Sequence, residues 1–207
     1  MTEIEIKARV ADPVATEAAI RAFARFERET VKLDEYWGLE GPADSFTKVR
    51  IREEDGVSTV TYKRKETRGD IEVNDEREFT VSDRSALECL LEDLGFAVYV
   101  KKEKRTKTFS CRAGNGTPVA IELSLVARLG WFVELEILAE NPDEEYVARA
   151  ESALRETLAR CGVPESAIER RFYTEMLSAL EGDDATGDEA TGDGTRDEAA
   201  DFHVPAK

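Results

Sequence analysis

The first seven residues, Met-Thr-Glu-Ile-Glu-Ile-Lys, restrict the fold of this chain more than any other segment, because their charged residues fall at every second position. On a β-strand, alternate side chains point to opposite faces, so Glu3, Glu5 and Lys7 would share one face and the two isoleucines the other. Two carboxylates beside a lysine suit a hard cation together with an anionic, phosphate-like ligand. A solvated amphipathic strand has the same spacing, so this segment alone leaves both interpretations open.

The same alternation of charged and apolar residues recurs along the chain. Further charged pairs are Arg50 and Arg52, Lys63 and Lys65, Glu76 and Glu78, Lys102 and Lys104, and Glu134 and Glu136. One charged strand face is normally the solvated side of a sheet. Several such faces, of both signs and with apolar residues opposite, favour a polar lumen wrapped by apolar packing, the inverse of the usual small barrel. Basic positions that face acidic ones inside one lumen would bind a polyphosphate together with its metal ions.

The pattern predicts an α+β fold, an eight-stranded antiparallel β-barrel with a polar lumen, flanked by about four helices. The expected strands are 2–9, 34–39, 45–53, 57–65, 71–81, 97–111, 117–126 and 131–139. Asp55-Gly56 is typical of the turn between the third and fourth strands, and Asn115-Gly116 of the turn between the sixth and seventh.

Four helices are expected from their end signals and apolar stripes. One begins after Asp12 with Pro13 in its first turn and carries Ile20, Phe23 and Phe26 on one face. The second spans 83–94, and the third opens at Asn141-Pro142 and ends at Gly162. Pro164 opens the fourth, whose expected inner face is Ile168, Phe172, Met176 and Leu180.

The acidic charge of the chain is concentrated at its C-terminus. Of the net charge of −16, residues 181–207 supply −7, from nine acidic and two basic residues, which leaves −9 for residues 1–180. Such a segment buries too little apolar surface to offset its ordering entropy, so 181–207 is expected to be a disordered tail behind one domain, 1–180. An acidic, lysine-poor surface suits a salt-rich cytoplasm, which leads us to the hypothesis of a halophilic source.

Composition also excludes several classes of function. An acidic field repels nucleic acid, and no apolar run approaches the roughly 20 residues that span a bilayer, so neither nucleic acid nor membrane is an expected partner. The N-terminus is charged from residue 3, which is unlike a signal peptide, and three separated cysteines suit a reducing cytoplasm. The single histidine, His203, lies in the polar tail, which argues against Ser-His or Cys-His catalysis and His/Cys zinc sites.

An ordered series of motifs makes the resemblance to a known family specific. The motifs are Glu3-x-Glu5-x-Lys7, Asp34-x-Tyr36, Val49-Arg50-Ile51-Arg52, Thr61-Tyr62-Lys63 and Leu129-Gly130-x-Phe132-Val133-Glu134-Leu135-Glu136. Over about residues 1–180 the chain resembles the CYTH family, the triphosphate tunnel metalloenzymes. That family includes class IV adenylyl cyclases, thiamine triphosphatases and inorganic triphosphatases. The resemblance implies a metal-dependent enzyme in which an eight-stranded tunnel binds a nucleoside or inorganic triphosphate.

The resemblance also assigns roles by position. Glu3, Glu5, Glu134 and Glu136 would bind Mg²⁺ or Mn²⁺, and Lys7, Arg50, Arg52, Lys63, Lys102 and Lys104 would hold phosphates. Lys7, Glu5 and Glu136 would be the catalytic residues. Arg105 competes with Lys104, since a slip of one residue exchanges the two faces of a strand.

The chain departs from the family pattern at Ser124, where members usually carry an aspartate. A neutral hydroxyl puts a second metal site in doubt, although Glu122, on the same strand face, is a candidate replacement. The usual Ser-Tyr pair near the C-terminus is Phe172-Tyr173, and packing is the expected role of that tyrosine.

Three functions stay open. The segments around Arg50 and Glu134 favour a class IV adenylyl cyclase, which would convert ATP to cyclic AMP and pyrophosphate. The alternatives are a hydrolase of tripolyphosphate or thiamine triphosphate, and a non-catalytic nucleotide or polyphosphate sensor. A homodimer is expected, because barrels with one exposed sheet face often pair.

Overall fold

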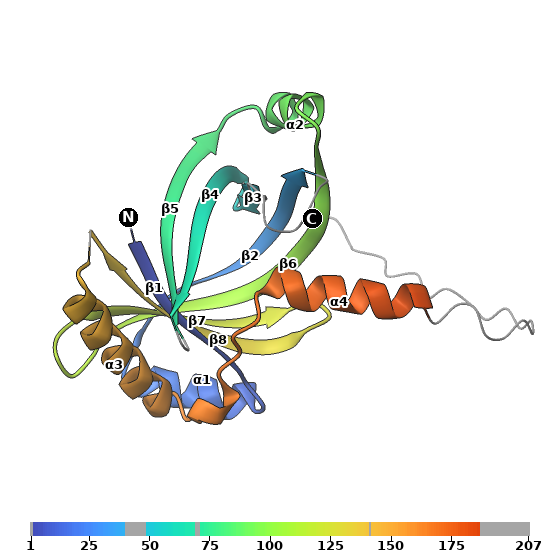
Figure 1. Ribbon diagram of the computed structural model, residues 1–207. Coiled ribbons are helices and arrows are strands. Elements are labelled where there is room, and N and C mark those ends of the chain that lie inside the picture. Colours follow the sequence, from blue (N-terminus) through green and yellow to red (C-terminus); the bar gives the residue numbers. More distant parts are fainter. Residues whose placement is uncertain (1, 40–48, 69–70, 141, 187–207) are drawn as a thin grey trace, which may run out of the picture.

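Eight antiparallel strands form one closed ring in the computed structural model (Figure 1). The structure describes residues 2–39, 49–68, 71–140 and 142–186, with the backbone alone at 63–68, 72–76 and 182–186. The strands are β1 (Thr2–Arg9), β2 (Arg25–Leu39), β3 (Val49–Glu54), β4 (Val57–Arg68), β5 (Ile71–Val81), β6 (Phe96–Arg112), β7 (Pro118–Val126) and β8 (Gly130–Ala139). Their order around the ring is β1-β5-β4-β3-β2-β6-β7-β8, and β1 closes it by pairing with both β5 and β8. The predicted eight-stranded barrel is confirmed.

The turn residues act as the sequence predicted. The β3–β4 ladder ends at the pair of Glu54 and Val57, which leaves Asp55 and Gly56 as a two-residue turn. Both have positive φ angles, 52° and 76°, as a tight hairpin turn requires. Gly116 has a φ of 84° in the β6–β7 connection. Of the predicted strand 45–53, residues 45–48 lie outside the described part of the chain.

Three helices lie close to their predicted positions. They are α1 (Pro13–Arg21), α2 (Arg84–Asp93) and α3 (Glu144–Arg160), and the carboxylates of Asp12, Asp83 and Asp143 cap their first turns. Each of these carboxylates accepts a hydrogen bond from a backbone N–H group that has no partner inside its helix.

The first helix is shorter than predicted, and the second strand is longer. Helix α1 ends at Arg21, and Phe26 lies on β2, where its ring packs edge-on against Phe109 of β6, with 5.5 Å between centroids. The i, i+3 spacing of Phe23 and Phe26 favoured a helix, but pairing with β6 along almost all of β2 determines the conformation. Tertiary pairing of this kind overrides local propensity.

The fourth helix also differs from its prediction. Residues Glu165–Ala167 form a single 3-10 turn, and α4 (Tyr173–Thr186) begins nine residues after Pro164. Between them the chain lies along β1: Ile168 forms an isolated bridge with Ala8, and the Glu169 N–H donates to the Lys7 carbonyl at 2.8 Å. These backbone contacts take the place of helical hydrogen bonds. The predicted tail begins within α4, and residues 187–207 lie outside the described part.

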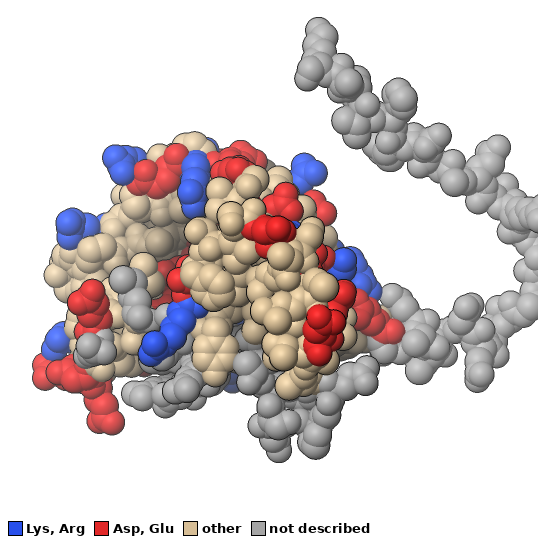
Figure 2. Space-filling model, turned by 90° about the horizontal axis from the view of Figure 1, so that it is seen from above, with Lys and Arg blue, Asp and Glu red and all other residues tan. Residues whose placement is uncertain are grey.

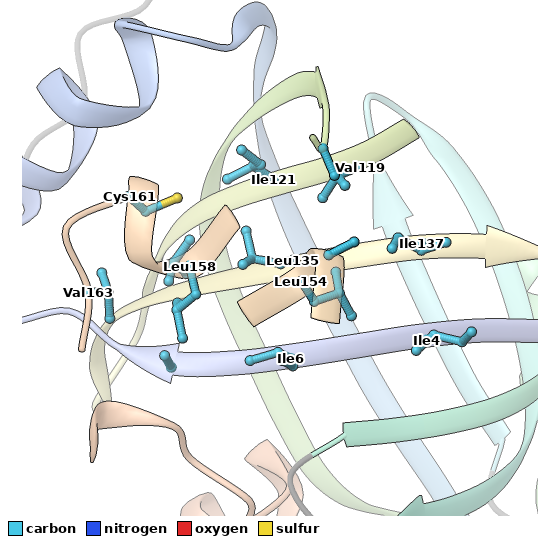
Figure 3. Packing of buried hydrophobic residues seen from close by; sticks show 14 of the residues in the cluster. Ile4, Ile6, Val119, Ile121, Leu135, Ile137, Leu154, Leu158, Cys161 and Val163 are labelled. Atoms are coloured by element: carbon cyan, nitrogen blue, oxygen red, sulfur yellow. The ribbon is translucent and has the colours of Figure 1, made fainter. Parts of the chain in front are cut away.

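The main hydrophobic core lies outside the barrel, between its wall and the helices α1 and α3. Figure 3 shows residues of β1, β7 and β8, among them Ile6, Ile121 and Leu135, packed together with Leu154 and Leu158 of α3. All five side chains are fully buried or nearly so. Burial of each such side chain contributes about 1.5–3 kcal/mol. The apolar faces of these strands therefore point outward to the helices, which leaves their polar faces to line the barrel.

A smaller core joins α2 to the wall, where Leu91 packs with Trp37, Ile51 and Val60. Trp131 packs against the main core, so both tryptophans are part of the apolar packing. Basic and acidic side chains are interspersed over the face drawn in Figure 2. Within the described residues, no helix has the length and apolarity needed to cross a membrane.

Candidate functional site

Buried charge marks the barrel interior as the candidate site. The lysines Lys7, Lys32, Lys102 and Lys104 and the carboxylate of Asp34 are each no more than 6% exposed. They alternate with outward-facing residues on β1, β2 and β6, so they share the lumen face. Removing an ammonium group from water costs several kcal/mol unless an anion compensates it. Four lysines held in this way make the lumen a place where an anion is stabilised.

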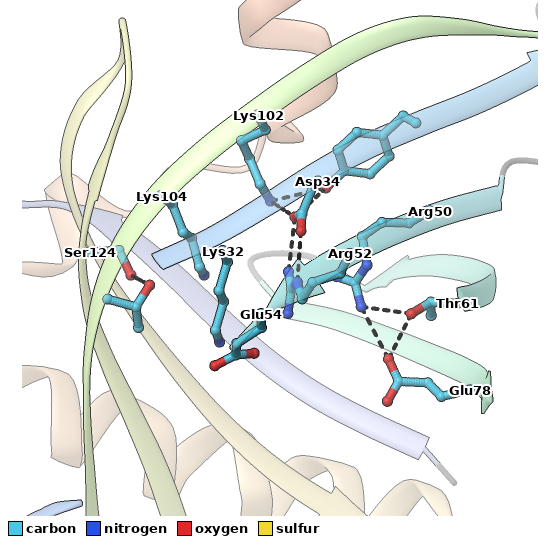
Figure 4. A network of polar contacts seen from close by, with 12 residues as sticks. Lys32, Asp34, Arg50, Arg52, Glu54, Thr61, Glu78, Lys102, Lys104 and Ser124 are labelled. Atoms are coloured by element: carbon cyan, nitrogen blue, oxygen red, sulfur yellow. Dashed lines mark hydrogen bonds and ion pairs between the residues drawn. The ribbon is translucent and has the colours of Figure 1, made fainter. Parts of the chain in front are cut away.

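Asp34 is the centre of the first polar network (Figure 4). Its carboxylate accepts two hydrogen bonds from the Arg52 guanidinium, at 2.7 and 2.9 Å, and lies 2.9 Å from the Lys102 Nζ. Burial alone would raise the pKa of Asp34, but Lys102 and Arg52 outweigh it and hold that pKa well below its usual value. The Lys102 ammonium also donates to the Tyr36 hydroxyl at 3.0 Å. Two cations, from the strands on either side of β2, thus share one anion.

Glu122 of β7 is the centre of the second network. Its Oε1 lies 2.5 Å from the Lys32 Nζ and its Oε2 lies 2.8 Å from the Lys104 Nζ, while Lys104 also pairs with Glu134 of β8. Burial opposes ionisation of both glutamates, but the lysines lower the pKa of each. Burial would lower the pKa of Lys104, and its two glutamate partners raise it instead. Burial, together with the nearby Lys104 and Arg52, lowers the pKa of Lys32, although Glu122 acts in the opposite direction. The network therefore favours the charged forms of Lys104 and of both carboxylates.

A third network extends along β3, β4 and β5. The Arg50 guanidinium donates to the Thr61 hydroxyl at 2.8 Å and to the Glu78 carboxylate at 3.1 Å, and that hydroxyl donates to Glu78 at 2.7 Å. Arg50 and Arg52 are two residues apart on one strand, so their side chains share a face. The backbone of Lys63 pairs with that of Glu76 on β5, and its side chain lies outside the described part.

The predicted metal-binding acids lie on neighbouring strands. Glu5 of β1 is paired with Glu136 of β8, Lys7 is paired with Glu134, and Glu3 is two residues before Glu5 on the same face. Carboxylate oxygens are the donors that a hard divalent cation prefers, so these residues fit such an ion by chemical type. As it stands, the described part of the chain holds no group of three acidic, histidine or cysteine side chains arranged to bind a metal. Glu122 and Glu134 are instead directed to lysines.

Tyr173, the first residue of α4, contacts two of the buried lysines of the lumen. The ammonium groups of Lys7 and Lys102 each lie 4.8 Å from the centre of its ring, within the range of cation–π attraction. Its buried hydroxyl has no hydrogen-bond partner among the described residues, and burial, with Glu134, Glu5 and Glu122 nearby, raises its pKa well above the usual value. The sequence predicted a packing role, and the ring does pack, edge-on against Phe132 at 5.1 Å.

The strand register places the residues whose roles the sequence left open, Lys104 or Arg105 on β6 and Ser124 on β7. Lys104 faces the lumen, whereas Arg105 is exposed on the outer face near Glu103. Ser124 is fully buried and shares a 3.0 Å hydrogen bond with the Thr106 hydroxyl. A hydroxyl pair of this kind is satisfied without a metal.

Sequence reasoning missed Lys32 as a site residue and used Asp34 only as part of a motif. The alternation of Lys32, Asp34 and Tyr36 was a usable signal, but the expected strand began at 34, whereas β2 begins at Arg25 and includes Lys32. Tyr173 had no sequence signal for a place over two lysines, because that position depends on how the chain after α3 lies against β1.

The family is decided by a match over most of the chain. The model of the CYTH domain matches residues 1–173. The chain belongs to the CYTH family. Enzymes of this family are cyclases or triphosphatases, and its triphosphate tunnel enzymes are metal-dependent. The buried cations described above thus lie in the tunnel of a CYTH domain. A search among curated proteins gave no match.

Solved structures share the fold. The PH1012 protein of Pyrococcus horikoshii is 29% identical, with a TM-score of 0.69 over 84% of this chain and 99% of its own. A Vibrio parahaemolyticus protein, provisionally named an adenylate cyclase, is 22% identical, with a TM-score of 0.68 over 86% and 98%. A Hippeastrum protein, provisionally named an adenylyl cyclase and described as having a dominant triphosphatase activity, is 16% identical, with a TM-score of 0.60 over 86% and 96%. At 22% and 16% identity, the last two show the fold alone.

Proposed function

We propose that this protein is a metal-dependent enzyme that binds a triphosphate inside its tunnel and catalyses attack on one of the phosphorus atoms. The observation that carries this proposal is the set of four buried lysines on the lumen face, each no more than 6% exposed. A polyanion that enters the lumen would exchange the internal carboxylates for phosphate oxygens. Membership of the CYTH family supports the same class of substrate.

The cations have distinct parts in this proposal. Arg52 already makes a two-bond contact with Asp34, and the same planar fork suits two oxygens of one phosphate. Lys102 and Lys104 act as point charges along β6, and Lys7 and Arg50 extend the basic lining on either side. Lys63 belongs to the proposed set by its position on β4. Transfer of a phosphoryl or nucleotidyl group needs mainly positioning and charge neutralisation, which these residues supply.

The acids on β1 and β8 would hold the divalent cation, Mg²⁺ or Mn²⁺. Glu3, Glu5, Glu134 and Glu136 offer only carboxylate oxygens, which suits either ion. When bound, such an ion supplies Lewis-acid polarisation of the phosphate under attack. Glu5 and Glu136 are direct neighbours across the β1–β8 ladder, and the adjacent Lys7 would bind the phosphate next to them. These three residues are the proposed catalytic set.

For the reaction itself, the first candidate is an adenylyl cyclase of class IV type. The ribose 3′-hydroxyl of ATP would attack the α-phosphorus, and pyrophosphate would leave as cyclic AMP forms. The motif series around Arg50 and Glu134 favours this branch. The solved structure from Vibrio parahaemolyticus carries the same provisional name, although at its identity it supports the fold only.

The second candidate is a triphosphatase, in which water replaces the ribose hydroxyl and orthophosphate is released. Every interaction described in the lumen is also suited to tripolyphosphate, because none depends on a nucleoside. The Hippeastrum protein, provisionally named an adenylyl cyclase and described by a triphosphatase activity, illustrates that both activities are ascribed to this fold. A third candidate, a sensor without turnover, rests on Ser124, whose buried hydroxyl bonds to Thr106.

Product identification separates these candidates. The protein is incubated with ATP or tripolyphosphate and Mg²⁺ or Mn²⁺, at low and at molar salt, and the products are followed by phosphorus NMR. Cyclic AMP with equal pyrophosphate is expected of the cyclase, and orthophosphate, released fastest from tripolyphosphate, of the hydrolase. Glu5→Gln should abolish either product, whereas Glu17→Gln, on the outer surface, should not. Tight binding without any product would favour the sensor, and absence of binding would contradict the proposal.

A further inference from the structure

We propose that Lys32 is a phosphate-binding residue of this tunnel and that Glu122 is its counter-ion until the triphosphate arrives. This inference rests on the proposed function, because it requires a triphosphate in the lumen. It gives Glu122 a different part from the metal ligand that the sequence suggested.

The position of Lys32 is that of a residue aimed into the site. It lies on β2 two residues before Asp34, on the lumen face, with its side chain 5% exposed. Figure 4 shows its ammonium group directed to the same interior as the ammonium group of Lys104 and the guanidinium group of Arg52. Its Nζ contacts Glu122 Oε1 at 2.5 Å, a contact that spans 90 residues of sequence and brings together two strands that are not neighbours in the ring.

The register places this lysine opposite a like charge. Lys32 of β2 is paired directly with Lys104 of β6 on one side and with Glu54 of β3 on the other, and both lysine side chains are buried on the same face. Like charges directly opposite each other on a strand pair destabilise a sheet. One carboxylate, Glu122, contacts both ammonium groups, and Lys104 shares a second carboxylate, Glu134. Two buried cations held opposite each other are expected where an anion with several charges binds between them.

The contacts of Glu122 show what such an anion would displace. Each of its two oxygens is taken by a different lysine, Oε1 by Lys32 and Oε2 by Lys104. The carboxylate therefore copies two oxygens of a phosphate group, with one oxygen for each ammonium. A phosphate that binds between Lys32 and Lys104 would replace Glu122 as the partner of both ammonium groups. Until it binds, Glu122 keeps both partners. We therefore expect the triphosphate to bind at this end of the tunnel without a metal as well as with one.

The test measures tripolyphosphate binding by titration calorimetry, once in EDTA and once with Mg²⁺. The variant Lys32→Met removes the charge and keeps most of the side-chain volume. In EDTA we expect it to bind about tenfold more weakly than the wild type, the effect of one lost charge-assisted contact. Glu122→Gln removes the competing carboxylate and should bind tripolyphosphate in EDTA at least as tightly as the wild type. Lys107→Met is the matched control, because Lys107 pairs with Glu17 at 2.6 Å on the outer face of β6.

Two results would overturn the inference. One is equal binding in EDTA by Lys32→Met and Lys107→Met; the other is a loss of binding in EDTA for Glu122→Gln. If Lys32→Met does not fold, the double variant Lys32→Met/Glu122→Gln removes both charges and is compared with Glu122→Gln, relative to which it should bind about tenfold more weakly. Wild-type protein that binds no tripolyphosphate in either buffer would instead contradict the proposed function itself.

Discussion

Replacement of Asp34 by asparagine is expected to destabilise the empty protein and to make it unusually responsive to a triphosphate. The carboxylate of Asp34 is fully buried and pairs with both Arg52 and Lys102. An asparagine at this position would keep the size of the side chain but leave two cations without their shared anion. Because a tripolyphosphate would offer both cations new anionic partners, its binding should restore much of the lost stability.

The size of the loss follows from the burial of the partners. Removing one member of a buried ion pair costs about 3–5 kcal/mol, because the remaining charge stays uncompensated. The Lys102 side chain is 4% exposed and that of Arg52 is 16% exposed. Water can therefore partly solvate the Arg52 guanidinium but not the Lys102 ammonium. We therefore expect the lower end, about 3 kcal/mol. For a folded unit of this size that corresponds to a fall in Tm of about 6–12 °C.

Scanning calorimetry with and without saturating tripolyphosphate tests both parts. The Tm gained on adding tripolyphosphate should be larger for Asp34→Asn than for the wild type. Asp12→Asn is the matched control, because asparagine caps a helix about as well as aspartate and α1 lies outside the barrel. A loss below about 1 kcal/mol, or an equal gain from tripolyphosphate in both proteins, would refute the assignment of Asp34 as the shared counter-ion of the tunnel cations.

Two further predictions concern stability. The pKa values of Asp34, Glu122 and Glu134 are lowered in the fold, so their stabilisation is complete above the ordinary carboxyl pKa, about 4. This stabilisation is lost as the pH falls through the lower pKa values that these carboxyl groups have in the folded protein. The Tm measured from pH 7 to 2 should therefore decline below about pH 4. A Tm that does not change with pH would contradict the charged networks. Tyr173→Phe should keep its stability within about 1 kcal/mol, because the hydroxyl has no partner in the described part of the chain, whereas Tyr173→Ala should lose about 3–5 kcal/mol in urea unfolding. A phenylalanine variant as unstable as the alanine one would show that the hydroxyl has a partner.

Alternation made most of the barrel predictable. The period of two in segments such as the one around Glu3 and Glu5 assigns each residue to a face, and the turn at Asp55-Gly56 fixes the register beside it. The start of β2 was missed because Phe23 and Phe26 have helical spacing, and only pairing with β6 shows that Phe26 belongs to a strand.

The candidate site could be predicted only where its residues alternate with apolar residues along a single strand. Arg50, Arg52, Lys102 and Lys104 were found from local alternation, and the structure brings the last three together around Asp34 and Glu122. Contacts between distant segments had no local signal. The pairing of Lys32 with Glu122 crosses the lumen, and it follows from ring closure rather than from either strand alone.

The prediction of the fourth helix was wrong for a related reason. Its apolar residues have helical spacing from Ile168 onward, but Ile168 and Glu169 bond to the backbone of β1 instead. That detour starts α4 at Tyr173 and brings its ring against Lys7 and Lys102. Where a connection crosses a finished sheet, the available hydrogen-bond partners decide its conformation more than its own pattern does.

The position of a bound triphosphate tests the central claim most directly. A crystal structure of the protein grown with tripolyphosphate should show the anion inside the barrel, with phosphate oxygens within hydrogen-bonding distance of Arg52, Lys102 and Lys104. Phosphates found only on the outer face, beside exposed cations such as Lys101 or Arg105, would contradict a triphosphate-binding tunnel.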